Sequence, residues 1–147
     1  MPKPLFILNG PNLNLLGQRE PDVYGRETLD DIRQLCAQRA TALSLSIDFR
    51  QTNQEGTLVD WLHEAKDAAC AVVLNPGAYT HTSVALYDAI KAIGVPVIET
   101  HLSNPAAREP FRHHSYVAPA ARGTIAGFGS TSYVLAVEAA ARLVAAQ

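Results

Sequence analysis

Short apolar segments alternate with segments of helical periodicity along the whole chain. Residues 5–8, 71–74 and 95–98 are almost continuously apolar, and residues 46–51 and 124–127 are two further candidate strands. Unbroken apolar runs are typical of strands buried on both faces, as in a parallel sheet covered by helices. Because crossovers between parallel strands are right-handed, the alternation predicts an α/β fold with a doubly wound five-stranded parallel sheet.

Residues that start or end helices mark the segments between the strands. Gly94 is expected to end the third helix, and the last helix is predicted over residues 130–145. The punctuation of residues 17–25 by Gly, Pro and Asp predicts a loop, and residues 104–121 are expected to be irregular. A length of 147 residues indicates one domain, 1–147. The expected helix starts are Thr28, with Asp31 three residues later, Thr57, Ser83 and Ser130.

Charge, hydropathy and cysteine usage exclude several classes of protein. A net charge of −2 gives no basic surface for nucleic acid. No apolar run approaches the ~20 residues that span a bilayer, and the N-terminus does not resemble a signal peptide. Cys36 and Cys70 are far apart and lack metal or redox spacing, so they are expected to be reduced core residues. A cytoplasmic protein is predicted.

Polar residues follow several of the predicted strands. In doubly wound sheets, ligands bind beyond the carboxyl ends of the strands, where the strand order reverses. The sequence therefore predicts that one edge of the sheet gathers these residues: Asn12, Arg19, Tyr24, Asn75, His81, Glu99, His101 and Ser103.

Glu99 and His101 are two apart on a predicted strand, so their side chains share a face. A carboxylate beside an imidazole fixes its tautomer and raises its pKa, which suits a general acid. The alternative is a histidine whose polar atoms are satisfied at a strand end. His81 and Asn75 lie in the loop after the third predicted strand and favour contact with a polar substrate, although Asn-Pro-Gly is also a turn signature by itself.

Arg19 and Tyr24 lie five residues apart in the predicted loop. A phenol has a pKa of about 10, so it acts as a base near neutrality only if its pKa falls by roughly two to three units. A guanidinium within about 4–6 Å lowers the pKa of a neighbouring acid by roughly 1–3 units. The alternative, which composition alone favours, is that both residues are surface side chains of a mobile loop with no role in a site.

Cofactor chemistry finds little support in the sequence. His81, Glu99 and His101 are suitable ligand types, but no helical His pair or Cys accompanies them, so no metal site is predicted. The glycines match neither a P-loop nor a complete dinucleotide fingerprint. No lysine lies at a predicted strand end, which leaves no obvious nucleophile for imine chemistry.

Long motifs, in order along nearly the whole chain, resemble the type II 3-dehydroquinate dehydratases. They occupy residues 9–17 (Asn-Gly-Pro-Asn-Leu-Asn-Leu-Leu-Gly), 19–25, 74–83, 99–104 and 108–116. The resemblance implies a flavodoxin-like fold with three α/β/α layers and assembly as a homododecamer built from trimers. It implies conversion of 3-dehydroquinate to 3-dehydroshikimate in the shikimate pathway of aromatic amino acid biosynthesis, without metal or organic cofactor.

The resemblance also implies a role for each matching residue. Tyr24 matches the base that removes the C2 proton, and Arg19 matches the arginine that favours its phenolate. Asn12 matches a residue that holds a water on the enolate intermediate. His101 matches the acid that protonates the departing hydroxyl, and Glu99 matches its orienting partner.

Further matches concern substrate binding and assembly. Asp88 matches a helix residue that enters the site of a neighbouring subunit, whereas Tyr87 and Ala106 depart from the family pattern. The competing interpretation is a non-catalytic flavodoxin-like module that binds a small anion or flavin. Candidates for both a base and an acid around one pocket favour the enzyme. The residues matched to contacts with substrate hydroxyls and carboxylate are Asn75, His81, Leu102, Ser103 and Arg112.

Overall fold

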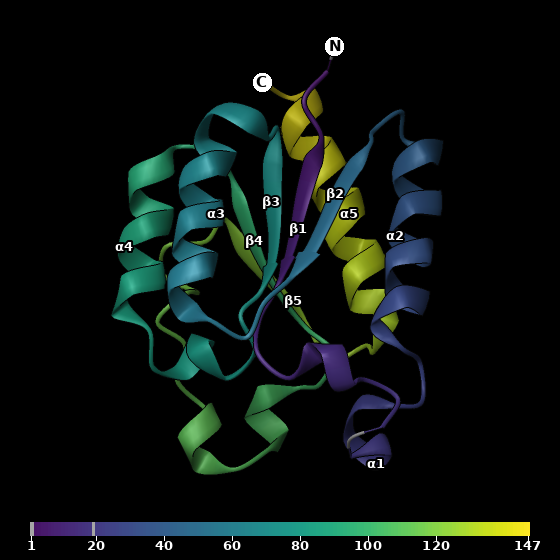
Figure 1. Cartoon of the computed structure of the whole chain (residues 1–147), viewed down its shortest axis with the longest axis vertical. Coiled ribbons are helices and arrows are strands. Elements are labelled where there is room, and N and C mark those ends of the chain that lie inside the picture. The colour runs from purple at the N-terminus through teal and green to yellow at the C-terminus, as the bar shows by residue number, and fades with distance from the viewer. Residues whose placement is uncertain (1, 19) are drawn as a thin grey trace.

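The computed structural model describes residues 2–18 and 20–147, and the side chains of Val23 and Tyr24 also lie outside the description. Five parallel strands form one sheet in the order β2-β1-β3-β4-β5 (Figure 1). This is the flavodoxin-like order, as the sequence predicted. The strands are β1 (Leu5–Asn9), β2 (Ile47–Gln51), β3 (Ala71–Asn75), β4 (Val97–His101) and β5 (Gly123–Ala126).

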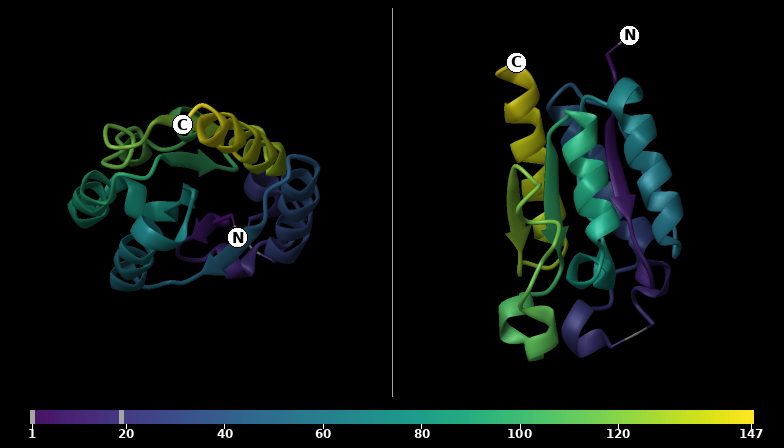
Figure 2. Two further views of the ribbon diagram at one scale, coloured as in Figure 1. Left: turned by 90° about the horizontal axis from the view of Figure 1, so that it is seen from above. Right: turned by 90° about the vertical axis from the view of Figure 1, so that its left-hand side faces the viewer.

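Two helices cover each face of the sheet (Figures 1 and 2), which confirms the three layers. One face carries α2 (Leu29–Ala42) and α5 (Ser130–Ala145), and the other carries α3 (Glu55–Ala68) and α4 (Val84–Ile93). Alternate residues of β1 serve the two cores. Leu5 and Ile7 pack on the α2–α5 side, and Phe6 and Leu8 pack on the α3–α4 side.

The helix ends follow the sequence signals closely. The Thr28 hydroxyl accepts the Asp31 N–H at 3.1 Å, and the Asp31 carboxylate accepts the Thr28 N–H at 3.0 Å, which completes a capping box on α2. The Ser83 hydroxyl caps α4 by accepting the Leu86 N–H at 2.9 Å. Gly94, with φ of 77°, ends the same helix.

The strands β2 and β5 differ from the prediction by one residue, and three further elements differ by more. The loop predicted over residues 17–25 contains a short helix, α1 (Pro21–Tyr24), because proline at the first helical position already has a helical φ. α3 begins at Glu55, before the expected Thr57. β4 begins at Val97 rather than residue 95 and continues through His101, because its polar end pairs with β5.

Both cysteines are free thiols, as predicted. Cys36 is buried on α2, and burial raises the pKa of its thiol to about 12. Cys70 precedes β3 and is partly buried. In the described part of the chain, no helix has the length and apolar character needed to cross a membrane.

Short helical turns extend the molecule beyond the carboxyl ends of the strands. α1 and the segment containing η3 (Pro105–Ala107) and η4 (Pro110–Arg112) lie there, and both chain ends lie at the opposite end of the sheet (Figures 1 and 2). A further turn, η2 (Gly77–His81), follows β3 directly. The predicted ligand-binding edge is therefore the end of the molecule at which these turns gather.

Candidate active site

A pocket opens at the carboxyl ends of β1, β3 and β4. Six of the residues predicted to form the site line it, which places residues far apart in the sequence around one cavity. Arg108, Leu13 and several small residues complete the wall. The predicted six are Asn12, Asn75, His101, Leu102, Ser103 and Arg112.

A second hollow, the side pocket, adjoins this pocket and shares His101, Pro105 and Arg112 with it. The predicted residues His81 and Glu99 line the side pocket. The two imidazoles and the carboxylate therefore surround a single region, with His101 at the boundary between the two cavities.

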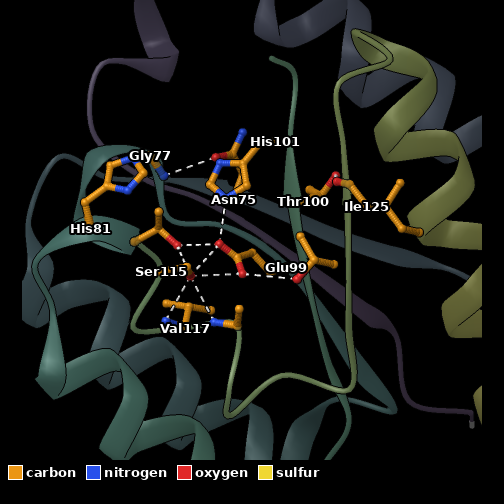
Figure 3. A network of polar contacts seen from close by, with 12 residues as sticks. Asn75, Gly77, His81, Glu99, Thr100, His101, Ser115, Val117 and Ile125 are labelled. Carbon is orange, nitrogen blue, oxygen red and sulfur yellow. Dashed lines mark hydrogen bonds and ion pairs between the residues drawn. The ribbon is translucent and has the colours of Figure 1, made fainter. Parts of the chain in front are cut away.

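The Glu99–His101 pair has the geometry expected from its spacing on β4. His101 Nε2 lies 2.6 Å from Glu99 Oε2 (Figure 3), and the Glu99 side chain is buried whereas part of His101 reaches the pocket. An ionised carboxylate only accepts hydrogen bonds, so Nε2 carries a hydrogen. Nδ1 is then the ring nitrogen that gains and loses the exchangeable proton.

Hydroxyl groups surround the Glu99 carboxylate. Thr80 donates to Oε2, Ser115 lies 3.0 Å from Oε2 and 3.2 Å from Oε1, and Thr124 donates to Oε1 at 3.3 Å. The Ser115 oxygen in turn accepts the backbone N–H groups of Val117 and Ala118. Those two donors occupy its lone pairs, so its only hydrogen points toward Glu99.

Every polar contact of Glu99 thus favours the anion. Burial by itself pushes the pKa of Glu99 upward, but the hydrogen bonds from His101, Thr80 and Ser115 outweigh burial, so its pKa lies below the usual value near 4.5. An ionised Glu99 fixes the tautomer and the ring orientation of His101.

His81 is held in one tautomer by the backbone. Its Nδ1 lies 2.8 Å from the carbonyl oxygen of His114, so Nδ1 carries the hydrogen and Nε2 presents a lone pair. Burial lowers the pKa of His81, and the positive charge of Arg112 adds to the effect. A neutral His81 is therefore a hydrogen-bond acceptor for a hydroxyl group.

Asn75 ends β3 and is buried except at the pocket. Its Oδ1 accepts the Gly77 N–H at 3.1 Å (Figure 3), and its Nδ2 donates to the Tyr133 hydroxyl at 2.8 Å. Both contacts fix the carboxamide, so Asn75 can present a hydrogen-bond donor in a defined direction.

Two arginines give the pocket a cationic wall. Arg112 donates to Glu109 at 3.0 Å, and Arg108 Nη1 donates to the Ser103 hydroxyl at 3.3 Å. Their side chains are only 17% and 15% exposed, so the surrounding protein screens their charge less than water would. Together with Ser103, these guanidinium groups suit a carboxylate-bearing ligand.

Asn12 enters the pocket from the loop after β1. Its backbone has φ of 70°, in the left-handed region that asparagine tolerates better than most residues. Its N–H donates to the Asn53 side chain at 3.0 Å. The exposed Asn12 side chain is thus held at the pocket by its backbone.

One predicted residue among those described, Asp88, is not brought into this arrangement. Asp88 lies on the exposed face of α4 and lines neither pocket in the described part of the chain. Arg19 and the side chain of Tyr24 lie outside the described residues. Tyr24 ends α1, which lies at the same end of the sheet as the pocket (Figure 1).

Metal-ligating side chains do not cluster in residues 2–18 and 20–147. Within these ranges no group of three or more His, Cys, Asp and Glu side chains has an arrangement that could hold a metal ion. Hydrogen bonds to the backbone or to Glu99 already engage both imidazoles.

The profile of the family described as Dehydroquinase class II matches residues 3–141. The chain belongs to this family. It is 62% identical over 143 residues to the 3-dehydroquinate dehydratase of Phenylobacterium zucineum (strain HLK1), covering 97% of this chain and 99% of that one. It is 64% identical over 140 residues to the 3-dehydroquinate dehydratase of Maricaulis maris (strain MCS10), covering 95% and 96%.

A solved class II dehydroquinase has the same fold. The type II dehydroquinase from Propionibacterium acnes superposes with a TM-score of 0.92 at 44% identity, covering 97% of this chain and 98% of that one. The class II dehydroquinase fold and the pocket residues therefore occur in one chain, which favours the enzyme over a non-catalytic flavodoxin-like module.

Several residues of this class II dehydroquinase site escaped the sequence interpretation. Thr80, Ser115 and Arg108 stand inside the motifs, but hydroxyl and guanidinium groups are both common on surfaces and gave no signal of their own. Thr124 was assigned only to a strand. Tyr133 lies in the last helix, where a buried aromatic residue is ordinary core.

Proposed function

We propose that the chain is a 3-dehydroquinate dehydratase of the shikimate pathway, a lyase that removes water from 3-dehydroquinate to give 3-dehydroshikimate. The observation that carries the proposal is the buried, ionised Glu99 bonded to His101 at the edge of an arginine-lined pocket. This is the arrangement needed to protonate a poor leaving group while a carboxylate substrate is held nearby.

His101 is the proposed general acid. Glu99 keeps a hydrogen on Nε2, so the imidazolium delivers its proton from Nδ1 to the departing C1 hydroxyl. A positioned acid of this kind contributes roughly 10²–10⁴-fold to the rate. The leaving group departs as water, and His101 is left neutral.

Tyr24 is the proposed base, with Arg19 lowering its pKa. The phenolate oxygen takes the C2 proton, and the electron pair of the C–H bond moves into an enolate. Collapse of the enolate re-forms the ketone, creates the C1–C2 double bond and expels the protonated C1 hydroxyl. Tyr24 then carries the proton that His101 lacks, and exchange with solvent resets both groups. The scheme uses only side chains of this chain.

The remaining residues hold the substrate. Arg112, Ser103 and the backbone of Leu102 are proposed to bind its carboxylate, supported by their position on the cationic wall. Neutral His81 accepts a hydrogen bond from a substrate hydroxyl, and Asn75 donates one. The side chain of Asn12 holds the water that stabilises the enolate oxygen.

We further propose that residues 1–147 form one catalytic domain, that the protein is cytoplasmic and that it assembles as a homododecamer built from trimers. Asp88 then contributes to the pocket of a neighbouring subunit, which its exposed position on α4 permits. The side chains of Phe111 and Phe128 are 68% and 66% exposed and offer apolar contact area. A native mass of twelve chains of 15.8 kDa by light scattering supports the assembly, and a monomer mass contradicts it.

The function is tested by adding 3-dehydroquinate to the purified protein and following the ultraviolet absorbance of the conjugated enone. Growth of this absorbance is expected in buffer treated with chelator. No absorbance under several buffer conditions would overturn the proposal in favour of a binding module. Borohydride added with the substrate traps an imine enzyme irreversibly. Activity that survives this treatment supports the enolate route, and its loss contradicts it.

A further inference from the structure

Tyr133 of α5 lies fully buried beneath the pocket, between the carboxamides that end β1 and β3. Its hydroxyl lies 2.6 Å from Asn9 Oδ1 and 2.8 Å from Asn75 Nδ2. Asn75 lines the pocket, whereas Tyr133 and Asn9 are not among the described residues that line it. The phenol thus reaches the ligand-binding region only through Asn75.

The hydrogen bonds around Tyr133 all run in one direction. The backbone N–H of Gly77 donates to Asn75 Oδ1, and Asn9 Nδ2 donates to the backbone carbonyl of Arg50 at 2.9 Å. A backbone N–H can only donate and a carbonyl can only accept, so the orientation of both carboxamides is fixed. Tyr133 must accept from Asn75 and donate to Asn9.

This direction decides what Asn75 offers to a ligand. Its oxygen is turned to Gly77 and one of its two amide hydrogens is bound to Tyr133. Its second amide hydrogen can be donated to a ligand in the pocket. Burial raises the pKa of Tyr133 well above its usual value, so the hydroxyl keeps its hydrogen and both of its bonds.

We propose that Tyr133 is a positioning residue that acts through Asn75, holding the Asn75 carboxamide as a hydrogen-bond donor toward a substrate hydroxyl. The inference rests on the proposed function for the identity of the ligand. Without the phenol oxygen, the Asn75 amide loses one of its two anchors and rotates more freely. Preorganisation of a donor improves binding because less freedom is lost when the ligand arrives.

The test is a double-mutant cycle measured with the enone assay. Tyr133→Phe keeps the ring and removes only the hydroxyl. KM is expected to rise about tenfold, with kcat changed less than about threefold, because the contact exists in both the ground state and the transition state. In an Asn75→Ala background, Tyr133→Phe is expected to leave KM unchanged, since the two side chains act as one unit.

Thr100→Val is the matched structural control. The Thr100 hydroxyl is also buried and donates to the Ile125 carbonyl at 2.9 Å, away from Glu99 (Figure 3). It makes no hydrogen bond to Asn75 in the described part of the chain, so this variant is expected to lower the Tm while KM keeps its wild-type value. If KM rises as much in Thr100→Val as in Tyr133→Phe, then loss of any buried hydroxyl is enough to weaken substrate binding, and the proposal is overturned.

Two further outcomes contradict the inference. An unchanged KM in Tyr133→Phe, or equal effects of Tyr133→Phe in the wild-type and Asn75→Ala backgrounds, would overturn it while leaving the proposed function intact. If Tyr133→Phe does not fold, Asn9→Ala decides the question by removing the acceptor at the far end. A raised KM in Asn9→Ala supports the proposal and a wild-type KM overturns it. A wild-type protein that forms no enone would overturn the proposed function, and this inference with it.

Discussion

Glu99 Oε2 and His101 Nε2 lie 2.6 Å apart on the same face of β4. The same carboxylate oxygen also accepts hydrogen bonds from Thr80 and Ser115, which leaves it little freedom to turn. The position of the imidazole is therefore set by a carboxylate that is itself held by hydroxyls on three other segments, η2, the 113–118 loop and β5.

The first prediction concerns this pair. Glu99→Gln replaces an acceptor-only carboxylate by an amide whose NH₂ group would face the donors of Thr80, Ser115 and His101, so the orientation of the imidazole is lost. We expect kcat to fall roughly 10²-fold, within the range for a positioned general acid, with a smaller change in KM. Steady-state enone kinetics measure both constants. Thr124→Val, which loses a single 3.3 Å contact to the same carboxylate, is the control and should lose far less activity.

The second prediction concerns acid stability. The pKa of Glu99 is lowered in the folded protein, so the unfolded chain binds a proton at higher pH than the folded one. This group therefore stabilises the fold above about pH 4.5 and loses that contribution as the pH falls through its folded pKa. Tm should drop more steeply from pH 5 to pH 3 in the wild type than in Glu99→Gln. Parallel Tm curves for the two proteins would contradict the assignment.

The third prediction distinguishes the roles of the two ring nitrogens of His81. His81→Asn retains a donor near the position of Nδ1, which bonds to His114, but lacks an acceptor at Nε2. His81→Gln retains an acceptor near Nε2. We expect KM to rise about tenfold in the Asn variant, the equivalent of one lost hydrogen bond, and much less in the Gln variant. The reverse order would show that Nε2 does not accept from the substrate.

The sequence predicted those parts of the fold that depend on local chemistry. Thr28 and Ser83 start helices and Gly94 ends one, as predicted, because a cap bonds to residues only a few positions away in the sequence. Apolar runs and right-handed crossovers predicted the doubly wound parallel sheet, and the family resemblance predicted its flavodoxin-like order. β4 was wrongly bounded because its polar end is stabilised by pairing with β5, a contact that local hydrophobicity does not reveal.

Contacts between distant segments explain what the sequence did not show at the site. Ser115 approaches Glu99 across 16 residues of chain, and Tyr133 reaches Asn9 across 124. Neither residue type carries a local signal for such a partner. By contrast, Glu99 and His101 were predictable as a pair, since a spacing of two on a strand places side chains on one face.

The fourth prediction tests the proposed base. Tyr24→Phe should abolish enone formation because no other phenolate is proposed to take the C2 proton. The Kd of this variant for 3-dehydroquinate, measured by calorimetry, should stay within about threefold of the wild-type Kd, since one hydroxyl is a small part of the binding surface. Tyr116→Phe removes an exposed phenol that lines neither pocket and should leave turnover unchanged. Substantial residual turnover in Tyr24→Phe would contradict its role as the base.

The last prediction concerns the junction that positions the pocket. Gly10 follows β1, and its N–H donates to the Asn75 carbonyl at 2.8 Å. A Cβ at Gly10 would lie 2.5 Å from the Pro76 carbonyl oxygen, so the two loops would have to separate. The two atoms nearest to this Cβ are the carbonyl oxygen and carbon of Pro76, and backbone atoms cannot rotate away as a side chain can. We therefore expect Gly10→Ala to lower the free energy of unfolding by about 1–3 kcal/mol.

Gly56→Ala is the matched control for this change, because a Cβ at Gly56, in the first turn of α3, meets no atom within 4 Å. It should be neutral or stabilise the protein by up to about 1 kcal/mol, as alanine is the better helix former. Denaturant unfolding of both variants measures the difference. The enone assay should also show a raised KM for Gly10→Ala, since moving the Pro76 loop displaces Asn75. A Gly10→Ala protein as stable as Gly56→Ala would mean that the two loops are not in tight contact.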